Sequence, residues 1–259
     1  MMTKSYEKHL KSAMTAAGNF LERAIGHAQK AKAQVGQRGG VQPILSLESI
    51  LGVNKISELV NASVERYVTP AVPELSGHAA MDLGEGPPQL LARFTEREAR
   101  LSLGFEIGGG SQGQQGDAKT GYIVRGKAQN VPIADNFFDY VALRLATPLQ
   151  GDILRVVKEA GRVLAPGGQG VLIDYHPYGM FAKKGPDRLR AIESSIRGIE
   201  DYYRICRTAG LRVVDVREAF IDENARNMFT DEAQAAFRTV KGSPLTVILF
   251  IYKPRVRSA

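Results

Sequence analysis

Runs of apolar residues separated by polar, glycine-rich breaks predict a chain in which strands alternate with helices from about residue 79 onward. Seven short runs rich in β-branched and aromatic residues are predicted strands, at residues 79–82, 100–107, 122–128, 137–145, 170–175, 211–220 and 245–252. Apolar positions at helical spacing predict helices at residues 90–98, 153–164 and 188–209. Because alternating strands and helices pack as a helix-covered sheet, we predict an α/β fold with a seven-stranded, mostly parallel sheet.

The first 75 residues carry a helical pattern instead. Residues 5–35 hold an apolar seam with alternating spacings of four and three, formed by Leu10, Met14, Ala17, Leu21, Ala24 and Ala28. Glycines at residues 36–40 break this helix, and Ser46 and Asn54 are predicted N-caps of two more helices. We therefore predict an N-terminal helical extension over residues 1–75 and a second domain over residues 76–259. The seam needs a partner surface, which is the body of the chain, a second copy or another protein.

The stretch over residues 79–91 is predicted to be a buried strand that turns tightly into a helix. Its apolar run ends at Asp82, glycines follow at Gly84 and Gly86, and a helical pattern begins at about Pro87. Glycines let a backbone approach a ligand closely, and the amides at a helix start point toward whatever lies there. Asp82 is expected at the strand's C-terminal end, where open parallel sheets bind ligands. An ordinary strand-turn-helix unit, with glycines for geometry alone, fits the same pattern.

A second acidic residue, Glu106, lies 22 positions after Gly84, near the end of the next predicted strand. This spacing is close to the ~20 residues expected for a carboxylate that binds a ribose hydroxyl, so it favours a nucleoside ligand. Residues 108–121 follow and are rich in Gly and Gln. Each glycine costs a helix ~1 kcal/mol relative to alanine, so we expect no crossover helix here. Either a mobile loop replaces it, or the strands on both sides form a long hairpin.

Composition and charge narrow the class of protein. The chain is 44% hydrophobic and 24% charged, as in soluble globular proteins, and its single cysteine, Cys206, excludes an intramolecular disulfide and a four-cysteine zinc site. No spacing of His, Cys, Asp and Glu indicates a metal site. With no signal segment and no membrane-spanning run, a cytoplasmic location is expected. The net charge of +7 comes from residues 1–40 and from Lys253, Arg255 and Arg257, which disfavours a nucleic-acid groove in the body of the fold.

Four segments occur in a fixed order along residues 79–254. Residues 81–87 read Met-Asp-Leu-Gly-Glu-Gly-Pro, and Glu106 ends the next strand. Residues 128–141 contain Ala-Gln-Asn-Val-Pro and lead into Phe-Phe-Asp-Tyr-Val, and residues 159–168 end in Pro-Gly-Gly. In this order they resemble the class I S-adenosylmethionine-dependent methyltransferases, of the type 11-like kind. In that family these segments are the turn at the cofactor's amino-acid end, the ribose-binding acid, the adenine loop and the approach to strand five.

The resemblance implies a Rossmann-like class I methyltransferase fold with S-adenosylmethionine as cofactor. The residues that it assigns to the cofactor are Asp82, Gly84, Glu85, Gly86, Glu106, Ala128 and Gln129. Three departures from the family pattern fall around this site. Pro88 stands in place of a third glycine, Lys127 stands where an acid usually contacts the adenine amine, and residues 108–121 stand in place of a helix. Together they raise the alternative of a relative that keeps the fold without the activity.

Methyl transfer from a sulfonium is an in-line displacement, which a base sometimes assists by deprotonating the acceptor. The candidate catalytic residues are Asp174, Tyr175 and His176, at the C-terminal end of the fifth predicted strand. His176 has the side-chain type suited to a base near neutral pH, although a structural histidine at a loop start fits the same place. Tyr202 and Tyr203 are candidates to line the acceptor site, and as neighbours on one helix at least one of them is expected in the core.

The leading prediction is S-adenosylmethionine-dependent methylation of a small molecule. The alternative is a catalytically inactive relative that serves as a binding or regulatory subunit, with a protein partner or a homodimer formed through the N-terminal helix. RNA methylation is a third and less favoured reading of the sequence.

Overall fold

The computed structural model describes residues 53–85, 88–107, 114–117, 121–144, 153–177, 198–229 and 234–255. All of them belong to the second of the two units into which the chain divides, Leu45–Ala259. The predicted helix over residues 5–35, the N-cap Ser46 and the first part of the predicted helix over 188–209 lie outside the described residues. No helix among the described residues is long and apolar enough to span a membrane.

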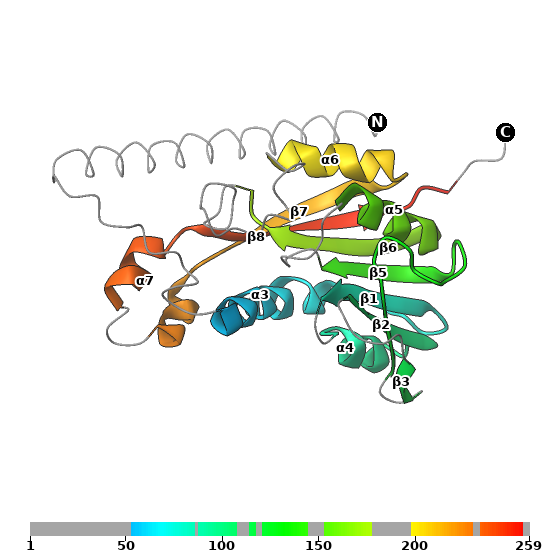
Figure 1. Cartoon of the computed structure of the whole chain (residues 1–259), viewed down its shortest axis with the longest axis horizontal. Helices are drawn as coiled ribbons and strands as arrows, with labels where there is room; N and C mark the ends of the chain where they lie inside the picture. The colour runs from blue at the N-terminus through cyan, green and yellow to red at the C-terminus, as the bar shows by residue number, and fades with distance from the viewer. Residues whose placement is uncertain are drawn as a thin grey trace, which may run out of the picture. The chain divides into compact units, whose positions relative to one another are not determined.

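The core of the fold is one eight-stranded sheet (Figure 1). Its order is β3-β4-β2-β1-β5-β6-β8-β7. The strands are β1 Ala79–Glu85, β2 Leu101–Ile107, β3 Gln114–Asp117, β4 Gly121–Gly126, β5 Phe138–Arg144, β6 Leu164–Tyr175, β7 Arg212–Phe220 and β8 Pro244–Tyr252. Strands β4, β2, β1, β5 and β6 are parallel, whereas β3, β8 and β7 each join the sheet through antiparallel pairs. The predicted mixed, mostly parallel α/β sheet is therefore confirmed.

Strand β3, which the sequence did not predict, lies in the Gly- and Gln-rich segment. It pairs antiparallel with β4, from Gln114 opposite Val124 to Asp117 opposite Gly121. Strand β2 pairs parallel with β4 on the other side. Of the two alternatives for this segment, a long hairpin between the flanking strands is therefore wrong, because β2 and β4 pair in parallel and the antiparallel partner of β4 is β3. A strand tolerates this composition because its hydrogen bonds go to a neighbouring strand and need no apolar face of its own.

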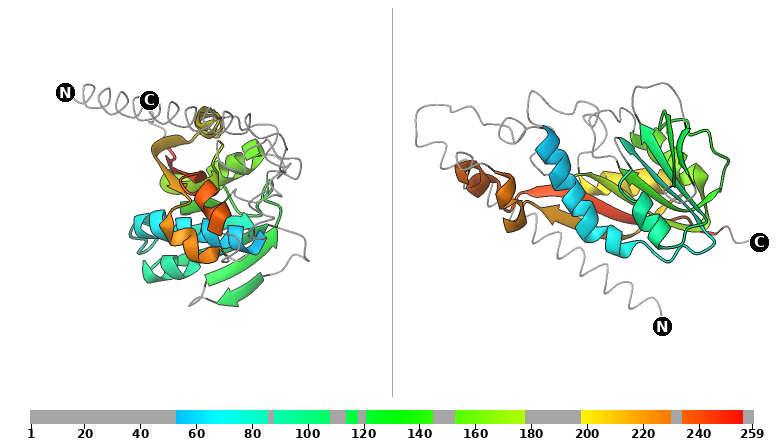
Figure 2. Two further views of the ribbon diagram at one scale, coloured as in Figure 1. Left: turned by 90° about the vertical axis from the view of Figure 1, so that its left-hand side faces the viewer. Right: turned by 90° about the horizontal axis from the view of Figure 1, so that it is seen from below.

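Helices cover both faces of the sheet. Helices α3 Val53–Tyr67 and α4 Leu91–Glu96 pack on one face, where Val64 and Phe94 contact the cluster that includes Ala142 and Ile173. Helices α5 Ile153–Val163 and α6 Ile199–Thr208 pack on the other face. The view from below in Figure 2 shows α3 crossing in front of the strands with α6 behind them. We call these the α4 face and the α5 face.

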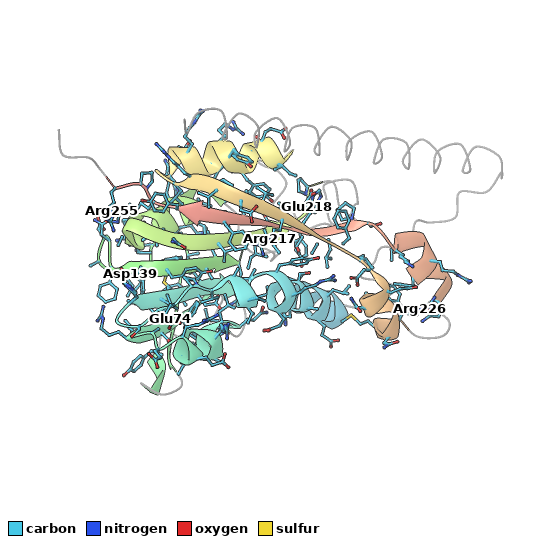
Figure 3. The ribbon with its side chains drawn as sticks, turned by 180° about the vertical axis from the view of Figure 1, so that it is seen from behind. Glu74, Asp139, Arg217, Glu218, Arg226 and Arg255 are labelled. Atoms are coloured by element: carbon cyan, nitrogen blue, oxygen red, sulfur yellow. The ribbon has the colours of Figure 1, made fainter. Side chains whose placement is uncertain are left out.

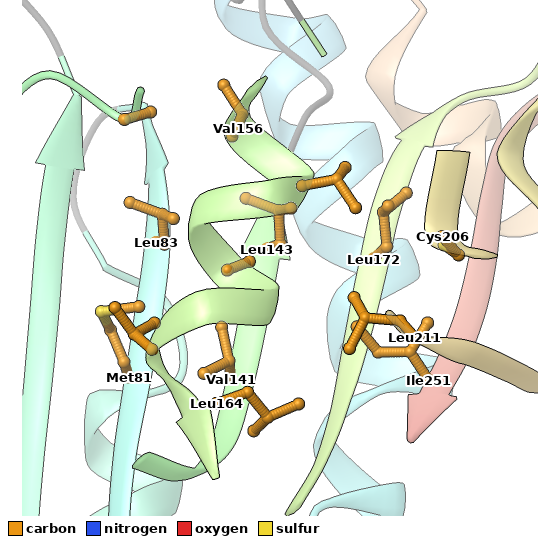
Figure 4. Close-up of a cluster of buried hydrophobic side chains, with 14 of the residues drawn as sticks. Met81, Leu83, Val141, Leu143, Val156, Leu164, Leu172, Cys206, Leu211 and Ile251 are labelled. Carbon is orange, nitrogen blue, oxygen red and sulfur yellow. The ribbon is translucent and has the colours of Figure 1, made fainter. Parts of the chain in front are cut away.

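Strand β1 shows how the two-residue repeat of a strand divides its side chains between the faces. Met81 and Leu83 belong to the buried cluster on the α5 face, with Leu143, Val156 and Cys206 among their companions (Figure 4). Ala80 belongs to the cluster on the α4 face. Because alternate side chains of a strand share a face, Asp82 and Gly84 are directed to the α4 face together with Ala80.

Sequence reasoning missed the elements at the far end of the sheet. A short turn η1 Thr69–Ala71 follows α3, and η3 Glu223–Met228 and α7 Gln234–Val240 precede β8. Apolar side chains of η3 and α7 form a third cluster with α3 and with the end of β6. The cluster contains Leu59, Val60, Tyr175, Ile221, Ala225, Phe229, Phe237, Val240 and Leu245.

We predict that Gly161→Ala destabilises the protein, against the usual preference of helices for alanine. Gly161 lies in α5, and a Cβ there would lie 2.6 Å from the carbonyl oxygen of Ala209. Helix propensity favours alanine by ~1 kcal/mol, but overpacking costs ~1–3 kcal/mol. The free energy of unfolding, measured in urea, should fall by about 1 to 2 kcal/mol. The exposed Lys158→Ala in the same helix should change it by less than ~0.5 kcal/mol, and a gain in stability for Gly161→Ala would contradict the prediction.

Candidate functional site

The C-terminal ends of the parallel strands meet at one edge of the sheet. Their register places Arg125, Glu106, Gly84, Arg144 and Ile173 side by side on β4, β2, β1, β5 and β6. Directly paired residues of parallel strands point to the same face, and Ile173 belongs to the cluster on the α4 face. The edge of this face therefore carries three charged side chains, those of Arg125, Glu106 and Arg144, with Gly84 between the last two and the apolar Ile173 at the end. We call these five residues the row.

Asp82 lies two residues before that glycine and is fully buried. Its Oδ2 accepts hydrogen bonds from the backbone amides of Gln89 at 2.7 Å and Leu90 at 3.0 Å. These are amides at the start of α4, which the sequence predicted would point toward a ligand. For these two amides the prediction is wrong, because a strand-borne carboxylate takes the place that an N-cap side chain usually fills.

Arg144 forms a buried ion pair with the other carboxylate oxygen of Asp82. Its Nε donates to Asp82 Oδ1 at 2.7 Å, and the two side chains are 8% and 0% exposed. A Cβ at Gly84 would lie 2.8 Å from both Cβ and Cζ of Arg144. Gly84 is therefore a glycine because the arginine side chain passes directly over it. The space that the sequence assigned to a ligand is occupied by a side chain of the chain itself.

The proline that departs from the family pattern has a packing role. A Cβ at Gly104 of β2 would lie 2.2 Å from Cγ of Pro88, so the pyrrolidine ring packs directly on the backbone of β2. Pro88 is bulkier than the glycine of the family pattern, and Gly104 on the neighbouring strand leaves room for its ring. Glu85 ends β1, but its side chain and Gly86 lie outside what the structure describes.

Glu106 reaches the same edge and is held by a second arginine. Arg125 Nε donates to Glu106 Oε2 at 2.6 Å, with the arginine 47% and the glutamate 24% exposed. Beyond β4, Lys127 is exposed, Ala128 is fully buried and Gln129 is half-buried. The structure therefore brings together Asp82, Gly84 and Glu106 as the sequence predicted, and adds an arginine to each of the two carboxylates.

The candidate catalytic residues lie at the end of β6. Asp174 is fully buried, and its carboxylate accepts hydrogen bonds from the Tyr202 hydroxyl at 2.7 Å and from the Tyr175 amide at 2.7 Å. Burial raises the pKa of Asp174 to about 7, although both hydrogen bonds act to lower it. Tyr202 comes from α6, so Asp174 faces the α5 face, whereas Asp82 faces the α4 face. Tyr202 is core, as expected for one of the tyrosine pair, and Tyr203 is exposed.

His176 is fully buried, and its Nε2 lies 2.7 Å from Oε1 of Glu218. Glu218 belongs to the outer strand β7, where Figure 3 shows it beside Arg217. A carboxylate at this distance fixes the orientation of an imidazole ring. Tyr175 is also buried and packs in the third cluster with residues of α3 and α7.

Sequence reasoning missed Arg125, Arg144 and Glu218. A signal was present for Arg144, because a single charge ends the otherwise uncharged run Tyr-Val-Ala-Leu of β5. For Arg125 and Glu218 there was none, because charged residues are ordinary on strands near an edge of a sheet. Within the described part of the chain, no group of three or more His, Cys, Asp or Glu could hold a metal ion.

Comparison with known proteins finds similar sequences for part of this region. A family model described as "Methyltransferase domain" matches residues 82–172. The demethylmenaquinone methyltransferase of Bacillus licheniformis is 39% identical over 62 residues, which are 24% of this chain and 27% of that protein. The demethylmenaquinone methyltransferase of Thermobifida fusca is 29% identical over 129 residues, 46% of this chain and 55% of that protein. The matches thus span less than two thirds of these relatives.

Solved structures show the same fold. A putative S-adenosylmethionine-dependent methyltransferase from Listeria monocytogenes aligns with a TM-score of 0.55 at 14% identity, over 76% of this chain and 100% of that chain. A chain from the complex of the Haloferax volcanii Trm112 methyltransferase activator with a putative methyltransferase aligns with a TM-score of 0.55 at 18% identity, over 83% and 100%. At such identities the likeness concerns the fold, which is the Rossmann-like class I methyltransferase fold.

We predict that Asp174→Asn becomes more stable relative to the wild type as pH rises. Between about pH 4 and pH 7 the Asp174 carboxyl, with its pKa raised to about 7 by burial, is protonated when folded and ionised when unfolded. Its contribution to stability therefore falls with pH across this window, whereas asparagine does not titrate. The difference in free energy of unfolding should grow by about 1 kcal/mol per pH unit and level off above pH 7.

Denaturant unfolding at several pH values measures this difference. Tyr202→Phe removes a hydrogen bond that lowers the pKa of Asp174, so it should move the upper end of the window above pH 7. A difference between Asp174→Asn and the wild type that does not change between pH 4 and pH 7 would show that Asp174 is ionised in the folded protein throughout.

Proposed function

We propose that this chain, whose residues 82–172 belong to the class I S-adenosylmethionine-dependent methyltransferase family, transfers a methyl group from S-adenosylmethionine to a small molecule. The observation that carries the proposal is the row at the edge of the sheet. Gly84 and Glu106 are direct neighbours on β1 and β2, at the C-terminal ends where sheets of this kind bind nucleotides.

The residues present fit the nucleoside part of this cofactor. Glu106 ends β2 with its side chain 24% exposed, and a carboxylate there accepts hydrogen bonds from ribose hydroxyls. Ala128 is small and buried beside Val131, so the adenine loop expected at residues 128–141 begins against the core. The amino-acid part fits less directly, because Arg144 lies over Gly84. S-adenosylmethionine supplies an activated methyl group on a sulfonium.

The chain's own contribution to the reaction would be to orient the acceptor, exclude water and hold a proton. His176 is the candidate base, and Glu218 holds its imidazole in place. Asp174 and Tyr175 remain candidates at the same strand end. Asp174 is better suited to positioning α6, because its carboxylate accepts hydrogen bonds from the Tyr202 hydroxyl and the Tyr175 amide.

The substrate class is a small organic molecule. The relatives from Bacillus licheniformis and Thermobifida fusca are named for methylation of demethylmenaquinone, which makes a naphthoquinol the first acceptor to assay. The matches span only 27% and 55% of those two relatives. We therefore propose the activity, the acceptor and a cytoplasmic location for this chain, and do not transfer them from the relatives.

A second candidate function rests on the two ion pairs. Two carboxylates assigned to the cofactor, Asp82 and Glu106, are bound by arginines of the same chain. If these pairs hold permanently, the protein is an inactive relative that acts as a binding or regulatory subunit. Its contact surface would then be the apolar seam predicted over residues 10–28, with a protein partner or a second copy.

We predict that S-adenosylmethionine and S-adenosylhomocysteine bind the purified chain and raise its unfolding midpoint. At about 100 times the dissociation constant, a ligand stabilises the folded state by ~2.7 kcal/mol, which for a chain of this size is roughly 5–10 °C. Titration calorimetry gives the dissociation constant directly. Glu106→Gln should weaken binding by about tenfold or more, because it removes a charged hydrogen-bond acceptor.

Glu74→Gln is the matched control, because Glu74 is an exposed carboxylate on the segment before β1 (Figure 3) and lies outside the row. It should leave both dissociation constants unchanged. If neither compound binds the wild-type chain at millimolar concentration, the methyltransferase proposal fails, and the inactive binding subunit takes its place.

A further inference from the structure

We propose that Arg144 is an internal occupant of the cofactor site, and that it must leave Asp82 before the amino-acid end of S-adenosylmethionine binds. The inference rests on the proposed function and deepens it. It assigns a role to a residue that neither the sequence pattern nor the comparisons single out.

Arg144 and a ligand would compete for the same volume above Gly84. The backbone of Gly84 is the surface that the tight turn offers for close approach, and the side chain of Arg144 covers it from Cβ to Cζ. A glycine in this place admits either the arginine or a ligand atom, since both would occupy the volume of the missing side chain. Arg144 and a ligand seated on Gly84 therefore exclude each other.

The charge of Asp82 must also be balanced when Arg144 leaves. Asp82 is fully buried, and a carboxylate away from water needs hydrogen bonds or a positive partner. Gln89 and Leu90 supply two amides to Oδ2, and Arg144 supplies the positive charge to Oδ1 at 2.7 Å. A ligand that displaces Arg144 has to replace this charge. The ammonium group of the cofactor's amino-acid end is a cation that does so.

The exchange thus keeps the buried carboxylate paired in both states. Arg144 leaves Oδ1, and the ligand ammonium takes its place. Because the site is competent only in the fraction of molecules in which Arg144 has moved, the apparent dissociation constant is the intrinsic one divided by that fraction. Arg144 therefore sets the affinity for ligands that carry the amino-acid end, and leaves unchanged the affinity for ligands that lack it.

Two probes separate these cases. S-adenosylhomocysteine carries the ammonium and carboxylate, whereas 5′-methylthioadenosine has the same nucleoside and sulfur without them. Arg144→Met removes the guanidinium while keeping a long apolar side chain that is free to bend away from Gly84. Calorimetry on the full chain should show S-adenosylhomocysteine binding at least about tenfold more tightly to this variant than to the wild type. The affinity for 5′-methylthioadenosine should change by less than about twofold.

Arg125→Met is the matched control. Arg125 is paired with Glu106 in the same row, but the pair is partly exposed and faces the ribose, which both probes contain. Its removal should change the two affinities alike, each by less than about fivefold. If Arg144→Met does not fold with Asp82 left unpaired, Arg144→Lys carries the test. It keeps the positive charge but lacks the planar group over Gly84, and should tighten S-adenosylhomocysteine binding alone.

The outcomes are distinct. Tighter binding of S-adenosylhomocysteine alone to the Arg144 variants, with measurable binding to the wild type, supports the inference. Unchanged or weaker binding of S-adenosylhomocysteine to the Arg144 variants, with normal binding to the wild type, overturns the inference and leaves the proposed function standing. Equal tightening of both probes overturns it as well, because it indicates a general loosening of the edge. If no protein binds either probe, both proposals fail.

Discussion

The buried ion pair between Asp82 and Arg144 is the interaction on which the edge of this sheet depends. It joins β1 to β5 across their paired ends, and the same carboxylate holds the first amides of α4. Removing one member of a buried pair typically costs about 3–5 kcal/mol, because the remaining charge stays in a place without water. Strand pairing, the start of α4 and the shape of the ligand site are therefore determined together.

Two glycines make this edge possible, and both serve neighbouring side chains. Gly84 leaves room for Arg144 from β5, and Gly104 leaves room for Pro88 from the turn after β1. The departure from the family pattern at Pro88 is consequently matched by Gly104 on the neighbouring strand and is not an isolated substitution. A compensated departure is consistent with selection for a defined geometry, whether that geometry binds a cofactor or keeps it out.

The sheet also separates two chemical environments. Asp82, Arg144 and Glu106 lie toward the α4 face, where the two arginine–carboxylate pairs are found. Asp174 lies toward α6 and accepts a hydrogen bond from the Tyr202 hydroxyl. His176 follows β6, and its Nε2 lies 2.7 Å from Oε1 of Glu218 on β7. In the proposed function, the first group binds the cofactor, His176 transfers a proton and Asp174 positions α6.

The sequence by itself determined the strands, the covering helices and the end of the sheet at which Asp82, Gly84 and Glu106 meet. These follow from local periodicity and from the rule that parallel strands end at one edge, which need only residues close in the chain. Only the tertiary structure decided that Arg144 lies over Gly84, that Arg125 holds Glu106 and that β3 replaces a helix. Each of these depends on strand register between distant segments, and local pattern does not encode it.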